Sequence, residues 1–120
     1  MNEQETLDFA RSLTAEQLLF ALLSKGGPLA ALAEAAAIAV GKTSDYDDGL
    51  KKDMYFPMGL VSYAQMLHVK SLRLVSLAAK EMKGGERKHE SARDTCLDLI
   101  NYASFAADWL AREEKSNAAR

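Results

Sequence analysis

The chain has 120 residues, 48% of them hydrophobic and 27% charged, and its formal net charge at pH 7 is −2. We expect one all-α domain over residues 1–120 with a modest core. The fifteen Lys and Arg residues are spread along the chain, which excludes a broad basic surface for duplex nucleic acid. The single cysteine, Cys96, is expected to be a small apolar core residue, and the short apolar runs predict a cytoplasmic protein without membrane contacts.

A glycine-rich turn joins the first two predicted helices. Thr14 and Gln17 have the spacing of a capping box and predict a helix at residues 14–24. Pro28 suits the first position of a second, alanine-rich helix that extends to about Lys42. We expect residues 1–13 to be poorly ordered.

A long loop is predicted between the second and third helices. Residues 43–56 contain turn-forming and charged residues without a helical period. Connections of this length are uncommon in compact domains and are frequently functional. Asp45, Asp47 and Gly49 suggest a calcium loop, but Phe56 stands where a bidentate glutamate is required, so we reject that interpretation.

Pro57 marks the start of a long third helix, predicted at residues 57–83. Its apolar side chains form one broad arc. The members of this arc are Leu60, Val61, Ala64, Leu67, Leu72, Leu74, Val75 and Ala78. His68 falls inside the arc, where we expect a partly buried, hydrogen-bonded histidine. Because four short helices do not cover so broad an arc, we also expect a homo-oligomer.

The fourth predicted helix covers residues 89–113, and the tail at 114–120 is expected to be disordered. At about 100° per residue, one face of this helix carries a polar stripe within an arc of roughly 80°. The polar stripe consists of Glu90, Asp94, Asp98 and Asn101. We expect the core face on the opposite side, at Cys96, Leu99, Ala103, Ala106 and Leu110. No segment has a strand period, so the predicted fold is a small bundle of about four helices.

The acids of the polar stripe need an explanation, because like charges one turn apart destabilise a helix by about 0.2–0.5 kcal/mol per pair. Simple solvation is one explanation. A second is Mg²⁺, for which Glu90, Asp94 and Asp98 are the candidate ligands. Lys70 and Arg73, on the third helix, either pair with these acids or bind a phosphate group.

Three segments together resemble the nucleotide modification associated domain family, whose small members are common in bacteriophages and prophages. In that family a Lys-x-x-Asp-Tyr element precedes a helix with Lys-x-x-Arg, and a last helix reads Glu-Ser, Asp-Thr, Leu-Asp-Leu and Asn-Tyr-Ala. The matching residues here are Lys42, Asp45, Tyr46, Lys70, Arg73, Glu90, Ser91, Asp94, Thr95, Asp98, Asn101 and Tyr102. The resemblance covers about residues 30–108 and implies a role in nucleotide metabolism or modification, in the cytoplasm of a phage host.

The last helix is also similar to that of the all-α nucleoside triphosphate pyrophosphohydrolases. In those enzymes, carboxylates on two adjacent helices bind Mg²⁺ for attack of water on the phosphate chain. The preceding helix of this chain has no acid between Pro57 and Lys80, and it has Lys70 and Arg73 in that region instead. Half of the metal ligands of those enzymes are therefore missing.

These features leave three hypotheses open. The first is a protein that binds a nucleotide or nucleotide derivative and sequesters a host defence signal without turnover. Its ligand-binding residues would be Lys42, Asp45, Tyr46, Lys70, Arg73, Asp94, Asp98, Asn101 and Tyr102. The second is a Mg²⁺-dependent nucleotide phosphohydrolase that uses the same carboxylates, so the sequence leaves open whether the protein is an enzyme. The third is a structural oligomeric module with internal salt bridges between the basic residues and the acids.

Overall fold

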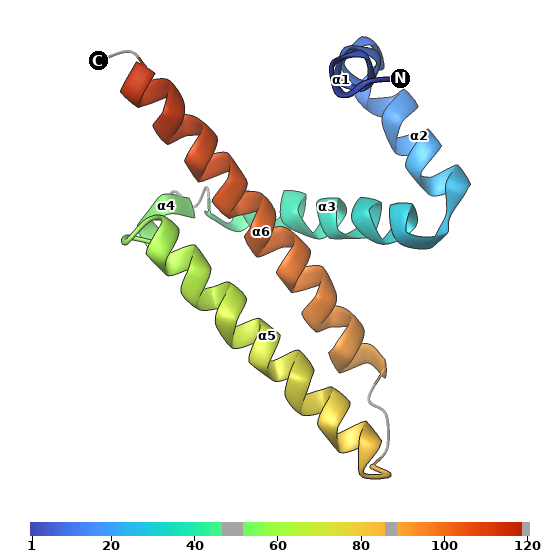
Figure 1. Ribbon diagram of the computed structural model, residues 1–120, viewed down its shortest axis with the longest axis vertical. Helices are drawn as coiled ribbons and strands as arrows, with labels where there is room; N and C mark the ends of the chain where they lie inside the picture. The colour runs from blue at the N-terminus through green and yellow to red at the C-terminus, as the bar shows by residue number, and fades with distance from the viewer. Residues whose placement is uncertain (47–51, 86–88, 119–120) are drawn as a thin grey trace. The chain divides into compact units, whose positions relative to one another are not determined.

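The computed structural model describes residues 1–46, 52–85 and 89–118, and the side chains of all these residues except 42–46, 52–53 and 89–91. The described residues form helices and no strand (Figure 1), which confirms the all-α class. In chain order the helices are α1 (Glu3–Ser12), α2 (Ala15–Lys25), α3 (Gly27–Tyr46), α4 (Lys52–Tyr55), α5 (Leu60–Met82) and α6 (His89–Ala118). Within the described part of the chain, none of these helices is both long and apolar enough to cross a membrane.

The chain divides into two compact units, Met1–Glu34 and Ala35–Arg120. In the first unit, Thr14 caps α2 through a complete capping box. The Thr14 hydroxyl accepts a hydrogen bond from the backbone N–H of Gln17, and the Gln17 side chain accepts one from the backbone N–H of Thr14. This confirms the capping box that the sequence predicts.

In the second unit, α5 and α6 form an antiparallel hairpin and lie side by side (Figure 1). Three pairs of residues define its register: Lys70 with Asp98, Tyr63 with Phe105, and Gly59 with Trp109. In and just before α5, Gly59, Tyr63 and Lys70 are spaced by four and then seven residues. On α6, their partners Trp109, Phe105 and Asp98 have the same spacing. One register therefore holds along the whole contact.

Gly59 allows the two helices to approach closely at one end of the hairpin. It precedes α5 with a φ of 59°, a left-handed conformation that residues with a Cβ rarely adopt. A Cβ on this residue would lie 2.6 Å from Cζ2 of Trp109. The position therefore requires glycine for two independent reasons.

An aromatic cluster of Phe56, Tyr63, Tyr102 and Phe105 forms the core of the second unit. Phe56 stacks on Tyr63 with ring centroids 4.6 Å apart, and Tyr102 meets Phe105 edge to face at 6.2 Å. Ala39 of α3 also packs against this core. Stacked and edge-to-face pairs of this kind stabilise a core beyond the burial of their area.

Several helix boundaries differ from the predicted ones. A helix, α1, covers most of residues 1–13, because Asn2 caps it and Glu3 and Glu5 favour its first turn. The predicted loop at 43–56 is wrong for residues 43–46 and 52–55, which are helical, and its residues 47–51 lie outside the described part. The expected disordered tail is helical through Ala118, because no glycine or proline interrupts it.

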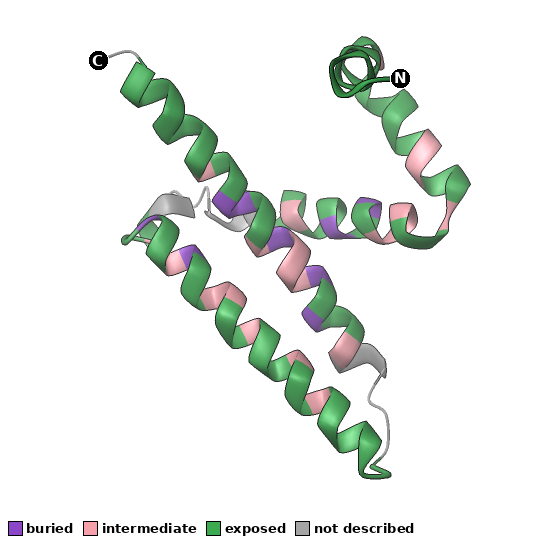
Figure 2. Cartoon of the chain, viewed as in Figure 1, coloured by how far each residue is buried: buried purple, intermediate pink, exposed green. Residues whose placement is uncertain are grey.

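The packed face of α6 also differs from the expected one. Buried residues concentrate along one part of α6 in Figure 2, and they are Thr95, Leu97, Asn101, Phe105 and Ala106. Of the expected core face, Ala106 is buried and Leu99 half-buried, whereas Cys96, Ala103 and Leu110 are exposed. The predictions of a core Cys96 and of a core opposite the polar stripe are therefore wrong.

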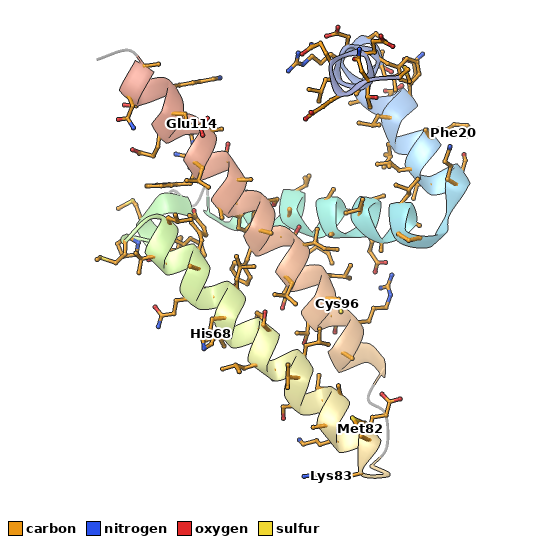
Figure 3. The ribbon with its side chains drawn as sticks, in the orientation of Figure 1. Phe20, His68, Met82, Lys83, Cys96 and Glu114 are labelled. Carbon is orange, nitrogen blue, oxygen red and sulfur yellow. The ribbon has the colours of Figure 1, made fainter. Side chains whose placement is uncertain are left out.

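His68 is exposed, so the expectation that it is partly buried is also wrong. Figure 3 shows it on the side of α5 away from α6. The reason is that α5 uses a different face for packing, the one that carries Tyr63 and Lys70. His68 lies two residues before Lys70 and therefore points away from that face.

Candidate functional site

Lys70 and Asp98 form an ion pair between α5 and α6. Lys70 Nζ lies 2.9 Å from Asp98 Oδ2, and the two side chains are 24% and 26% exposed. The pair sits in the middle of the hairpin, where the register places the two residues opposite each other. A charge-assisted hydrogen bond in this half-buried position is stronger than one on an open surface.

Asn101, one turn beyond Asp98 on the same face of α6, is buried with 4% of its surface exposed. Among the residues that the structure describes, its Nδ2 has no hydrogen-bond partner. Leaving a buried amide unpaired costs about 1–3 kcal/mol. Buried polar groups without partners are rare in native proteins and often have a functional role.

Tyr102 lies beside Asn101 in sequence and belongs to the aromatic cluster. Its ring is half-buried and meets Phe56 at a centroid distance of 6.0 Å, edge to face. Phe56 and Tyr63 lie in the same cluster. The structure thus gives these aromatic side chains a role in the core.

The other described candidates are not brought together with the ion pair. Arg73 follows Lys70 by one turn and is exposed, and Asp94 precedes Asp98 by one turn and is exposed. Both residues remain accessible to a ligand at the rim of the hairpin. The structure therefore pairs Lys70 with Asp98 and places Asn101 one turn beyond Asp98 on α6. Tyr102 belongs to the aromatic cluster, and Arg73 and Asp94 are exposed.

Four candidates have side chains outside the described part of the chain. Lys42, Asp45 and Tyr46 belong to the last turns of α3, and Glu90 belongs to the first turn of α6. Among the described side chains, no group of three or more His, Cys, Asp or Glu residues is arranged to hold a metal ion. Of the proposed Mg²⁺ ligands, Asp98 is paired with Lys70, Asp94 is exposed, and the side chain of Glu90 lies outside the described part.

Thr95 is a buried polar residue that reasoning from the sequence did not single out as a site residue. It is 2% exposed and is one of the buried residues of α6. Thr95 is buried because the face of α6 that packs differs from the face that the sequence predicts. The signal in the sequence was the pair of apolar residues Leu97 and Phe105, which lie beside the polar stripe.

Taken together, Lys70 and Asn101 carry hydrogen-bond donors of the kind that bind an anionic or carbonyl-bearing ligand, and neighbouring atoms cover the Asn101 Nδ2. Lys70 has three N–H donors, of which the contact with Asp98 needs one. The Asn101 amide has two N–H donors, and its Nδ2 has no partner among the residues that the structure describes. Asp98 can accept hydrogen bonds in return, as it does from Lys70.

Comparisons with protein families, with curated proteins and with solved structures found no match to this chain. The resemblance to the nucleotide modification associated domain family therefore stays a prediction.

Proposed function

We propose that this protein binds a nucleotide or a nucleotide derivative at the centre of the α5–α6 hairpin. The observation that carries the proposal is the buried Asn101 amide, whose Nδ2 has no partner among the described residues. An amide N–H pair is suited to carbonyl and ring-nitrogen acceptors on the edge of a base. Lys70 and Arg73 would contact phosphate, and the half-buried Tyr102 would stack on the base.

Binding gives a physical reason for keeping a polar residue at position 101. An apolar residue there would pack against Leu97 and Phe105 without an unpaired donor, so the free protein would be more stable. Such a sacrifice of stability is typical of sites that must bind a polar ligand. A ligand acceptor would remove the desolvation cost when it bonds to the amide.

Access to Asn101 requires a local movement, because its Nδ2 is covered by neighbouring atoms. The hairpin register places Leu67 of α5 opposite Asn101, and Leu67 is half-buried. Movement of the side chains around Asn101 would have to expose the amide before a ligand acceptor could bond to it. The ligand would then bind only an open arrangement of the hairpin. Its apparent affinity would equal the affinity for the open arrangement multiplied by the fraction of molecules that are open.

The test is a retention assay with the full chain. The protein is incubated with a mixture of nucleoside mono-, di- and triphosphates and cyclic nucleotides, with and without Mg²⁺, and the bound and free fractions are identified by mass spectrometry. We expect an intact nucleotide in the bound fraction. A new, Mg²⁺-dependent product would show that the chain turns the nucleotide over, and the absence of any retained nucleotide or product would contradict the proposal.

Two variants locate the binding site. Asn101→Leu should lose retention, because it removes the free amide donors. Asn117→Leu changes an exposed asparagine near the end of the same helix and should retain the nucleotide as the natural chain does. Retention by both variants would place the site elsewhere.

A second candidate function is a structural module, and the Lys70–Asp98 ion pair favours it. Under this hypothesis the pair only connects α5 to α6. Lys70→Met should then destabilise the protein, with no nucleotide retained by the natural chain. Nucleotide retention that Lys70→Met weakens would instead give Lys70 a role in binding.

A further inference from the structure

We propose that the face of α5 opposite α6 is a self-association surface, on which a second copy of this chain packs its own α5. This surface is separate from the Lys70–Asp98–Asn101 site and does not depend on the proposed function. We call it the outer stripe of α5. It consists of Val61, Gln65, His68, Leu72, Val75, Ala79 and Met82, all of which are exposed.

The spacing of the outer stripe is that of a helix-packing seam. Its members recur at alternating intervals of four and three residues over the whole length of α5. This alternation keeps side chains on one face of two helices that pack along their length. Five of its seven members are apolar, and only Gln65 and His68 are polar, whereas a solvated helix face is mostly polar or charged.

The distribution of charged residues around α5 also indicates an interface at the outer stripe. At about 100° per residue, the half of α5 centred opposite Lys70 contains no Asp, Glu, Lys or Arg from Val61 to Met82. The charged residues of this helix, Lys70, Arg73, Lys80 and Glu81, all lie on the other half. Depletion of charge at the centre is the compositional mark of a protein interface, whereas an exposed helix face is normally charged.

The exposed area fits a dimer. Val61, Leu72, Val75 and Met82 are 64%, 56%, 64% and 89% exposed, and neighbouring Val69 is 49% exposed. Together these five residues expose on the order of 500 Å², which reaches the upper range of the largest apolar patch on a typical monomer. Two such faces and the small residues between them approach the roughly 1,200–2,000 Å² that specific interfaces bury.

A second copy is the occupant that these observations favour. The stripe contains no Asp, Glu, Lys or Arg, so it offers no complementarity to a strongly acidic or basic partner, and it matches the same face of a second copy. A two-fold axis near Leu72, the middle of the stripe, would bring each stripe against its own copy. The small side chains of Ala64, Ser71, Ser76 and Ala79 would let the two helices approach closely.

The test is the mass of the full chain in solution by sedimentation equilibrium. We expect the natural chain to be a dimer, or a multiple of one, and Leu72→Lys to halve the mass. The matched control is Leu110→Lys, which places the same charge at an exposed leucine of α6 and should leave the mass unchanged. A monomeric natural chain, or a Leu72→Lys variant that keeps the full mass, would overturn the proposal.

A second measurement decides the matter if Leu72→Lys loses its helical circular dichroism. The variant Leu72→Cys with Cys96→Ser carries one thiol in the middle of the outer stripe. A short bifunctional maleimide should join it into covalent dimers at low protein concentration. The natural chain, whose only thiol is the exposed Cys96 on α6, should stay monomeric on a denaturing gel. Equal cross-linking of the two proteins, or none, would overturn the proposal.

Discussion

At Asn101, stability and ligand binding are expected to oppose each other. Its buried Nδ2 has no partner in the described part of the chain, so replacing the amide by an apolar side chain of similar size removes a desolvation cost. We expect Asn101→Leu to raise the free energy of unfolding by about 1–2 kcal/mol. Urea unfolding measures this change, with Asn117→Leu as the control that should stay within about 0.5 kcal/mol of the natural chain. A loss of stability in Asn101→Leu would mean that the amide is a structural group.

Gly59 is the residue whose substitution should damage the hairpin most. Gly59→Ala introduces a Cβ into the ring of Trp109 and forces alanine into a left-handed conformation. The combined cost should be about 2–4 kcal/mol of unfolding free energy. Gly41→Ala is the control, because nothing lies within 4 Å of its Cβ position and its helical φ suits alanine. It should leave stability unchanged or raise it by up to about 1 kcal/mol.

At the scale of helices, removal of the Lys70–Asp98 ion pair tests how much this contact between α5 and α6 contributes to stability. Its side chains are about one quarter exposed, so its removal should cost more than an exposed pair and less than a buried one. We expect Lys70→Met to lower the unfolding free energy by about 1–2 kcal/mol. The exposed Lys80→Met on the same helix should change it by less than about 0.5 kcal/mol.

A double-mutant cycle separates the interaction energy of the Lys70–Asp98 pair from the packing energy that each substitution changes. If the contact is real, Lys70→Met should cost less when Asp98 is already leucine. Additive effects of the two substitutions would show that the two side chains do not interact in solution.

Thr14 should control the start of α2. Thr14→Ala removes the hydroxyl of the capping box and should destabilise the first turn of α2 by about 1 kcal/mol. Hydrogen exchange should then be faster for the amide of Gln17, which loses its acceptor. Ser24→Ala, in the last turn of the same helix, serves as the control. Unchanged exchange at Gln17 in the Thr14 variant would contradict the capping box.

The sequence predicted helices well where local chemistry determines them. Thr14 with Gln17 and the glycines after residue 25 mark the ends of α2, and both signals are local. The loop at 43–56 was predicted from weak helix formers such as Thr43, Ser44 and Asp45. Such residues lower helix propensity by less than about 1 kcal/mol each, so α3 can continue through them.

The site could be predicted only in part, because the packed face of α6 depends on tertiary contacts. Asp98 and Asn101 were identified from their spacing, but their stripe was expected to lie apart from the core. In the structure α5 covers part of that stripe, where Lys70 neutralises Asp98. Periodicity cannot distinguish this arrangement from the expected one, since α6 carries apolar residues on more than one side.

At the scale of the whole molecule, self-association should link stability to protein concentration. A dimer that unfolds to separate chains gains about 1.4 kcal/mol per mole of dimer for each tenfold rise in concentration. We therefore expect the melting temperature of the natural chain to rise with concentration and that of Leu72→Lys to stay constant. A melting temperature of the natural chain that is independent of concentration would contradict association through the outer stripe of α5.

The most direct test of the proposed binding site follows the side-chain amides by nuclear magnetic resonance. The chain has only three asparagines, Asn2, Asn101 and Asn117, so their NH₂ signals can be assigned by substitution. During titration with the nucleotide retained in the binding assay, we expect the Asn101 signals to shift and to exchange more slowly with water. The exposed Asn2 and Asn117 signals should stay in place. An unchanged Asn101 signal at saturating nucleotide would contradict the account.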